Sequence, residues 1–158
     1  MDKDKIKNLG DIGEDIVANY FTNEGCKVIK AYNPYDNKKD MTVDDKTVEV
    51  KTQQPHVKMG ALTFRSNQLP KCSAAGRLIF VTAEADFDVN YKWNNCLFEV
   101  LPGFQTKPYT TKTGVKMIAI PIEQPYVEFI KKLHPDEAFI LNKYKQSNYK
   151  DGRMVNYA

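Results

Sequence analysis

The stretch DMTVDDKTVEVK, residues 40–51, alternates polar and apolar side chains on either side of two turn-forming aspartates. Side chains along a β-strand point alternately to its two faces. A two-residue turn, at 44–45 or at 45–46, would therefore gather the apolar side chains on one face of a hairpin and set Asp40 beside Glu49 on the other. A three-residue turn would mix the two faces, so the sequence predicts a definite register.

Two carboxylates and an ammonium group on one face suit metal-dependent chemistry at phosphate. Mg²⁺ takes oxygen ligands and usually relies on one or two carboxylates together with water and substrate phosphates. Asp40 and Glu49 would supply the carboxylates, and the backbone carbonyl of Val50 a third oxygen. A bound metal lowers the pKa of water and polarises a phosphoryl oxygen. Lys51 would orient the attacking water or stabilise the charge of the transition state.

The order Asp40, an eight-residue spacer, Glu49, one residue and Lys51 resembles the motif of the PD-(D/E)XK nuclease superfamily. The context adds to the motif. Residues 10–21 have apolar side chains at helical spacing, as in the first helix of that family, and an apolar strand over 26–31 follows. The resemblance covers about the first third of the chain and is closest in style to archaeal Holliday-junction resolvases and small restriction-type endonucleases.

The resemblance also implies roles for residues outside the motif. An acidic residue of the first helix often completes the metal site in this family, which carries over to Glu14 because it borders the apolar stripe near Phe21. Related nucleases often place a glutamine near phosphate or water, which carries over to Gln53 and Gln68. The chain departs from the family pattern at Lys39, where the family has proline.

The fold implied is an α/β restriction endonuclease-like core with a mixed central β-sheet flanked by helices, an additional β-hairpin and C-terminal helices. The activity implied is hydrolysis of phosphodiester bonds by a DNA endonuclease in recombination, repair or restriction. Mg²⁺ is the expected cofactor, with Mn²⁺ as a substitute, and no organic cofactor is expected. The expected partners are DNA and a second copy of the chain in a homodimer. Arg65, at the end of a predicted strand, is a further candidate for contact with DNA.

The same residues fit a protein that does not cut DNA. A charged hairpin facing solvent and packed on an amphipathic helix gives the same pattern, and a non-catalytic nucleic-acid-binding or assembly module could retain a nuclease fold. Gln53 and Gln68 are then solvated amides, and Arg65 merely ends a strand. Against this alternative, carboxylates clustered without a metal repel one another.

The rest of the chain is expected to extend one domain, residues 1–158, with a core at about 8–82 and added structure over 85–158. Beyond the hairpin, the periodicity and turn residues predict further strands and helices. The predicted strands are 61–65, 77–82, 89–93, 96–100, 109–112 and 115–120. Three helices are predicted: one opens at 66–70 and ends near 76, a second covers 126–133, and a third begins at 135. The tail over 143–153 interleaves basic and aromatic residues, which suits DNA, a partner subunit or a solvated terminus equally.

Composition agrees with a globular protein. The 158 residues are 42% hydrophobic and 27% charged. No apolar run approaches the ~18 residues of a membrane span, and residues 1–5 lack a signal-peptide pattern. A cytoplasmic protein without membrane contact is therefore expected. The three cysteines lack the spacing of a zinc site and suit free thiols.

Charge is distributed unevenly along the chain. Residues 1–50 carry eight Lys and Arg against eleven Asp and Glu, whereas residues 51–158 carry fifteen Lys and Arg against nine Asp and Glu. This asymmetry suits an acidic metal site beside a basic surface for phosphate.

Overall fold

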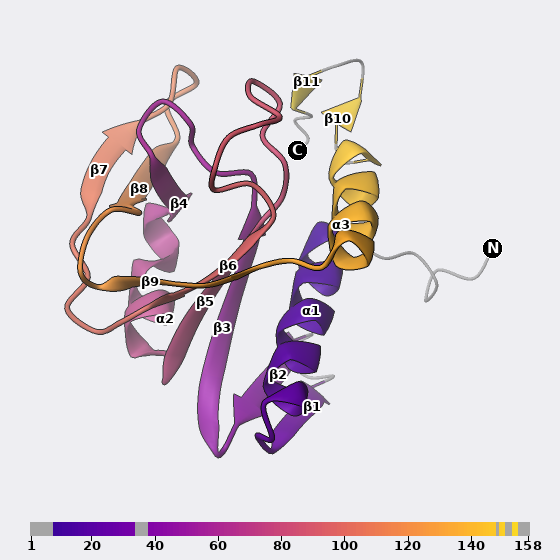
Figure 1. Cartoon of the computed structure of the whole chain (residues 1–158). Helices are drawn as coiled ribbons and strands as arrows, with labels where there is room; N and C mark the ends of the chain where they lie inside the picture. The colour runs from indigo at the N-terminus through magenta and orange to yellow at the C-terminus, as the bar shows by residue number, and fades with distance from the viewer. Residues whose placement is uncertain (1–7, 34–37, 148, 151–152, 155–158) are drawn as a thin grey trace.

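The structure of the protein is a computed structural model that describes residues 8–33, 38–147, 149–150 and 153–154, with side chains placed over 8–30 and 41–145. Its centre is a six-stranded mixed β-sheet. Helices α1 and α3 cover one face of this sheet, and a three-stranded sheet together with α2 covers the other (Figure 1). The expected mixed α/β architecture is confirmed at this level.

The helices are α1 (Leu9–Asn23), α2 (Leu69–Ala74) and α3 (Pro135–Ser147), and a 3-10 turn, Ser66–Gln68, leads into α2. The large sheet has the order β1 (Val28–Asn33), β2 (Lys38–Val43), β3 (Lys46–Gln53), β5 (Arg77–Thr82), β6 (Cys96–Val100) and β9 (Val127–Lys132). The second sheet has the order β4 (Ala61–Arg65), β8 (Lys116–Pro121) and β7 (Lys107–Thr110), and β10 (Tyr149–Lys150) pairs with β11 (Arg153–Met154). In the large sheet β3 and β5 are parallel, and the other neighbours are antiparallel.

The hairpin of β2 and β3 has the predicted register. Val43 pairs with Lys46, so the turn has two residues, Asp44 and Asp45. Both have positive φ, 49° and 69°, as a type I′ turn requires, and aspartate tolerates this conformation better than most residues.

The apolar side chains of the hairpin all reach the core beneath α1. Met41 and Val43 are buried there, and Val48 and Val50 pack against the same cluster. Because side chains alternate along β3, Glu49 and Lys51 face the opposite side, toward α2. The predicted sorting of polar and apolar side chains is therefore confirmed for the described side chains.

Helix α1 packs closely against β3. The side chain of Asn8 caps the helix by accepting a hydrogen bond of 2.9 Å from the Asp11 amide. The apolar stripe buries Ile16 and Val17 almost fully. Gly13 faces Thr52 of β3 so closely that a Cβ at position 13 would lie 2.8 Å from the Thr52 Cβ and 2.9 Å from its Cγ2.

Two predicted elements are wrong. Residues 127–132 form a strand rather than part of a helix over 126–133, because β6 offers them a row of backbone hydrogen-bonding groups that outweighs their helical spacing. Residues 89–93 form turns rather than a strand, and β6 pairs with β5 and β9 instead. The buried Asn94 stabilises this loop by donating to the carbonyl of Asp88 and accepting from the amide of Ala85.

Other predicted elements are confirmed. Strands 61–65 and 77–82 have the predicted bounds, a hairpin joins β7 to β8, and α3 begins at Pro135. Neither the 3-10 turn nor α2 receives a capping hydrogen bond from the side chain of its N-cap residue, Arg65 and Gln68 respectively. All three cysteines are free. Within the described ranges, no helix has both the length and the apolar character needed to cross a membrane. The role predicted for the tail, residues 143–153, depends on side chains beyond residue 145. These side chains lie outside the described part of the chain.

We expect Gly13→Ala to lower the free energy of unfolding by about 1–3 kcal/mol, because the new methyl group would overpack against Thr52. Inside a helix, alanine is more favourable than glycine by up to ~1 kcal/mol, so helix propensity alone would raise the free energy of unfolding. Denaturant unfolding followed by circular dichroism measures the difference. Gly10→Ala in the same helix is the matched control, because among the described residues its Cβ would meet only the Asn8 side chain, at 3.3 Å. Equal effects of the two substitutions would contradict this account of the packing.

Candidate functional site

The candidate site lies where β2 and β3 part. Their pairing covers residues 41–43 against 46–48 and does not continue beyond Met41 and Val48 in the described part of the chain. On its other side β3 remains paired with β5 from Val48 to Gln53. The edge of β3 that faces β2 is therefore open from Glu49 onward, which leaves backbone oxygen atoms available to a ligand.

A small cavity of about 70 Å³ occupies this fork. One water needs roughly 10–15 Å³, so the cavity has room for a cation with a few waters. Residues from α1, β1, β2, β3 and α2 converge on it although they belong to different layers of the fold. Its lining consists of Glu14, Lys30, Met41, Val48, Glu49, Val50 and Lys71.

Glu49 is held between two ammonium groups. Its carboxylate oxygens lie 3.2 Å from the Nζ of Lys51 and 3.6 Å from the Nζ of Lys71. The Glu49 side chain is only 16% exposed, which reduces screening of these contacts by solvent. The carboxylate is therefore electrostatically compensated in the protein alone.

Lys51 is oriented by a second contact. Its Nζ donates a hydrogen bond of 2.9 Å to Oε1 of Gln68, the residue just before α2. The start of α2 thus fixes the position of the amine beside Glu49. Gln68, predicted to contact DNA or water, has this role in the structure, and its contact with DNA stays a prediction.

The structure brings together three of the four predicted metal ligands. Glu14, Glu49 and Val50 line the cavity at the fork. Asp40 lies in β2 next to Met41, and one further step of the observed register would set its backbone opposite Glu49. The side chain of Asp40 is outside the described residues, so its part in the site stays a prediction.

The oxygen donors at the fork suit Mg²⁺ when water and substrate complete its coordination. Among the described side chains, no group of three or more His, Cys, Asp or Glu could hold a metal ion. Mg²⁺ uses only one or two protein carboxylates and completes its octahedral shell with water and substrate oxygens. Glu14 and Glu49, with the Val50 carbonyl, fit that requirement in kind and number.

A second hollow, of about 370 Å³, lies on the α2 side of β3. It is lined by Lys51 together with Gln53, Arg65 and Gln68, the three predicted DNA contacts. Arg65 is exposed at the end of β4. We call this surface the Lys51 groove.

Gln53 has a structural role in the Lys51 groove. Its amide nitrogen donates to the carbonyl of Thr63, and its Oε1 accepts a hydrogen bond of 2.7 Å from the amide of Thr63. These bonds tie the end of β3 to β4 and occupy both ends of the side-chain amide. Contact of Gln53 with phosphate stays a prediction.

Cys72 packs in the core on the α2 side of Glu49 and Lys51. Burial raises the pKa of its thiol, and the Lys51 charge only partly opposes this effect. Cys72 is therefore a neutral thiol near pH 7 and does not supply a thiolate to the site.

Sequence reasoning missed the two lysines of the fork. Lys71 follows Pro70 in α2, and Lys30 lies on β1, where it pairs with Asp15 at 2.8 Å. Neither belongs to a motif, and only the tertiary fold brings Lys71 to Glu49 and Lys30 to the wall of the same cavity.

The arrangement combines carboxylates, an oriented amine and an open backbone edge at one point of the sheet, next to a groove that carries Arg65. Such a set can bind a hard cation and an anionic oxygen together. Comparisons of the chain with protein-family models, with curated proteins and with solved structures gave no match.

Proposed function

We propose that this protein is a Mg²⁺-dependent DNA endonuclease of the restriction endonuclease-like kind. The observation that carries the proposal is the convergence of Glu14, Glu49 and the backbone of Val50 on one cavity, with the Lys51 amine 3.2 Å from the Glu49 carboxylate. Glu14 comes from α1 and the other three from β3, and all belong to the site that the D…ExK motif and the first helix predict.

Glu14, Glu49 and the Val50 carbonyl would hold the cation, with Asp40 as the further predicted ligand. Bound there, Mg²⁺ supplies charge neutralisation at the phosphate and a lowered pKa for water. Lys51, fixed by Gln68, places a positive charge where negative charge develops as water adds to phosphorus and a P–O ester bond breaks. The departing oxygen takes up a proton, which completes hydrolysis.

The order of elements supports a nuclease core. Helix α1, strand β1, the β2–β3 hairpin, α2 and β5 follow one another in the order that the resemblance implies, with β4 added before α2. In the sheet, β1, β2, β3 and β5 are neighbours in that order, with β3 parallel to β5. This topology sets the open edge of β3 beside α1, where Glu14 lies.

DNA is the proposed substrate, and Mn²⁺ would substitute for Mg²⁺. Arg65 in the Lys51 groove and Lys71 at the fork give the substrate backbone two cationic contacts that flank Lys51. A homodimer would cut both strands of a duplex. We place the activity in recombination, repair or restriction, in the cytoplasm.

A second candidate, a non-catalytic DNA-binding or assembly module, is favoured by one observation. Glu49 has two ammonium partners, so its charge is compensated without a metal. Repulsion between clustered carboxylates therefore argues less strongly for a metal than the sequence alone indicates. The two candidates differ in whether Mg²⁺ leads to strand cleavage.

We expect Glu49→Gln to reduce DNA cleavage by on the order of 100-fold or more, because the amide keeps the shape of the side chain but loses the charge that binds the cation. Nicking of plasmid and cutting of linear duplex, single-stranded, flapped and four-way DNA should be measured with Mg²⁺ and with a chelator. Glu123→Gln is the matched control, since Glu123 is a 72% exposed carboxylate also paired with a lysine, Lys92. Identical products from parent and Glu49→Gln would leave only the binding module.

We expect Gln68→Met to lower kcat about 5- to 10-fold with little change in KM, because a hydrogen bond to a charged group contributes about 1.5–3 kcal/mol and partial exposure reduces that value. Gln68→Glu retains an acceptor for Lys51 and should restore most of kcat. Asn67→Ala, at the exposed neighbouring position, is the control and should leave kcat unchanged. A rise in KM alone would show that Gln68 contacts DNA rather than positioning Lys51.

A further inference from the structure

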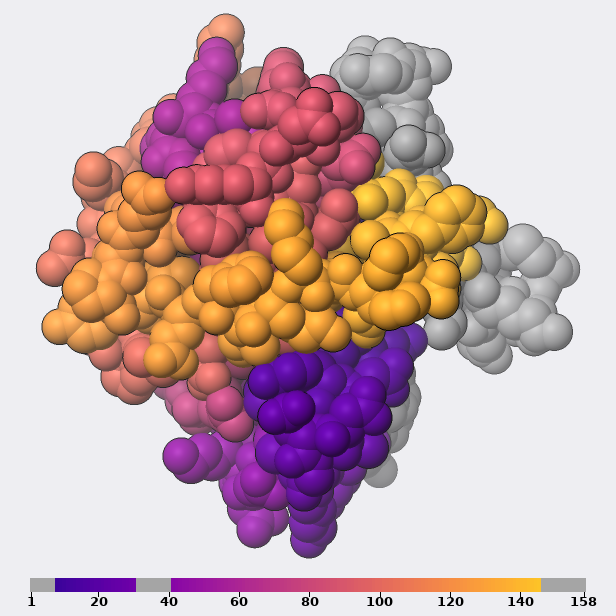
Figure 2. All heavy atoms as spheres, viewed as in Figure 1, coloured from indigo at the N-terminus to yellow at the C-terminus, as the bar shows by residue number. Residues whose placement is uncertain are grey.

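A cavity of about 730 Å³ lies beyond the end of β3, away from the fork. Its walls come from the start of α1, the end of β3 and the following loop 54–58, the loop between β5 and β6, and α3. The two loops stand at the same end of the molecule (Figures 1 and 2). A volume of this size is typical of sites for small organic groups.

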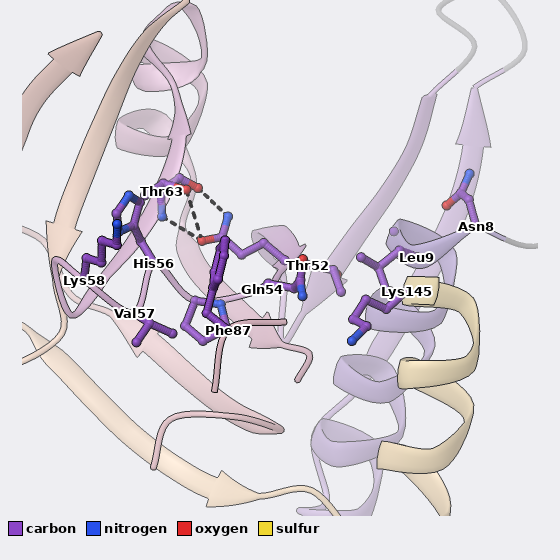
Figure 3. A pocket seen from close by; sticks show the side chains of 13 residues that line it. Asn8, Leu9, Thr52, Gln54, His56, Val57, Lys58, Thr63, Phe87 and Lys145 are labelled. Atoms are coloured by element: carbon purple, nitrogen blue, oxygen red, sulfur yellow. Dashed lines mark hydrogen bonds between the residues drawn. The ribbon is translucent and has the colours of Figure 1, made fainter. Parts of the chain in front are cut away.

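The walls are apolar with an aromatic side chain at the opening. Leu9, Pro55 and Val57 line the cavity, and Phe87 lies between the His56 side and the Leu9 side (Figure 3). Phe87 is 92% exposed, the highest value among the large hydrophobic residues described as exposed. The ring contributes almost nothing to the core, so its face is free to stack on a ligand.

The polar groups of the cavity favour an anionic ligand. Two lysines and no carboxylate occur among its described lining residues. Lys145 is bonded to the Glu84 carbonyl and the Asp86 carboxylate, whereas Lys58 is exposed at the rim. His56 accepts the Met59 amide at Nδ1, which leaves Nε2 as a hydrogen-bond donor in the neutral ring.

The cavity adjoins the Lys51 groove, because Thr52, Gln53 and Thr63 line both hollows. Gln53 and Thr63, which the two hollows share, are hydrogen-bonded to each other. From Lys51 to Pro55 an extended chain covers roughly 13 Å. At about 3.4 Å per nucleotide along a strand, that span corresponds to roughly four nucleotides.

We propose that this cavity binds an unpaired nucleobase of the DNA, stacked on Phe87, with the adjoining phosphate near Lys58. The choice of nucleic acid as ligand rests on the proposed function. An exposed aromatic ring, apolar walls, a hydrogen-bond donor and an excess of positive charge are together what an unpaired nucleotide needs. A base in a paired duplex has both faces covered by its neighbours and must leave the stack before Phe87 can contact it. A site of this kind therefore gives the protein a preference for single-stranded or locally unpaired DNA.

The test compares affinities of parent and Phe87→Ala by fluorescence anisotropy, with Ca²⁺ in place of Mg²⁺. The probes are a fluorescein-labelled single strand, the same strand with abasic sites, and a fully paired duplex. Phe87→Ala should weaken binding of the single strand about 5- to 150-fold, the range expected for one stacked base, with no change for the duplex. The abasic strand should bind the parent as weakly as the intact strand binds Phe87→Ala.

The exposure of Phe87 makes the variant informative, because removing an exposed ring leaves the core intact. Phe87→Trp retains an aromatic face and should bind the single strand as the parent does. Val89→Ala removes another exposed apolar side chain from the same loop without touching the cavity, and should have no effect. Equal affinity of parent and Phe87→Ala for the single strand, or an equal loss for the paired duplex, would overturn the proposal.

Cleavage assays separate this inference from the nuclease proposal. If the parent cuts DNA with Mg²⁺ while Phe87→Ala binds every probe normally, the base site is wrong and the nuclease proposal stands. If the parent cuts no DNA but binds single strands in a Phe87-dependent way, the nuclease proposal is wrong and the base site stands.

Discussion

The close approach of α1 to β3 is the constraint on which the site depends. Gly13 has no Cβ, so the helix backbone can lie directly against Thr52. The next residue, Glu14, is thereby brought to the fork where β3 has lost its pairing with β2. A larger residue at 13 would move the helix outward and carry Glu14 away from Glu49. One glycine in a helix interior, normally a cost of about 1 kcal/mol, thus sets the geometry of a site that spans two faces of a sheet.

The parting of β2 and β3 explains how carboxylates from opposite faces can share one cavity. Val48 and Val50 belong to the core beneath α1, whereas Glu49 faces α2 and its lysines. In a continuous sheet these two sides would be separated by the backbone ladder. At the fork the ladder stops, so a group bound there can reach α1 on one side and Glu49 on the other. Its ligands can include backbone oxygen, which no side-chain motif reveals.

The sequence predicts the hairpin well because strand alternation and the preference of Asp44 and Asp45 for a type I′ turn are local properties. Lys71 had no such signal, since its place beside Glu49 depends on how α2 packs. The strand over 127–132 was missed for a related reason. Its apolar residues fit helical spacing equally well, and only the free edge of β6 decides for a strand. Local chemistry therefore predicted the carboxylates and the amine of the motif, while tertiary packing determined their partners.

The two hollows along β3 differ in how their side chains are held, in a way that suits different tasks. Around Lys51 the side chains are held by bonds between elements: Gln68 fixes the amine, and Gln53 ties β3 to β4. Chemistry at phosphate needs such fixed charges, because a group that must reorient gives up part of its stabilisation of the transition state. At the far end, Phe87 projects from a loop and is almost fully exposed. Stacking tolerates variation in sequence, since every base offers a flat face, so an exposed aromatic ring without hydrogen-bonded supports would suffice there. A charged groove with hydrogen-bonded side chains next to an exposed aromatic ring is the division expected if, as proposed, the base sets position along the DNA strand and the sheet holds the groups that react at the phosphate.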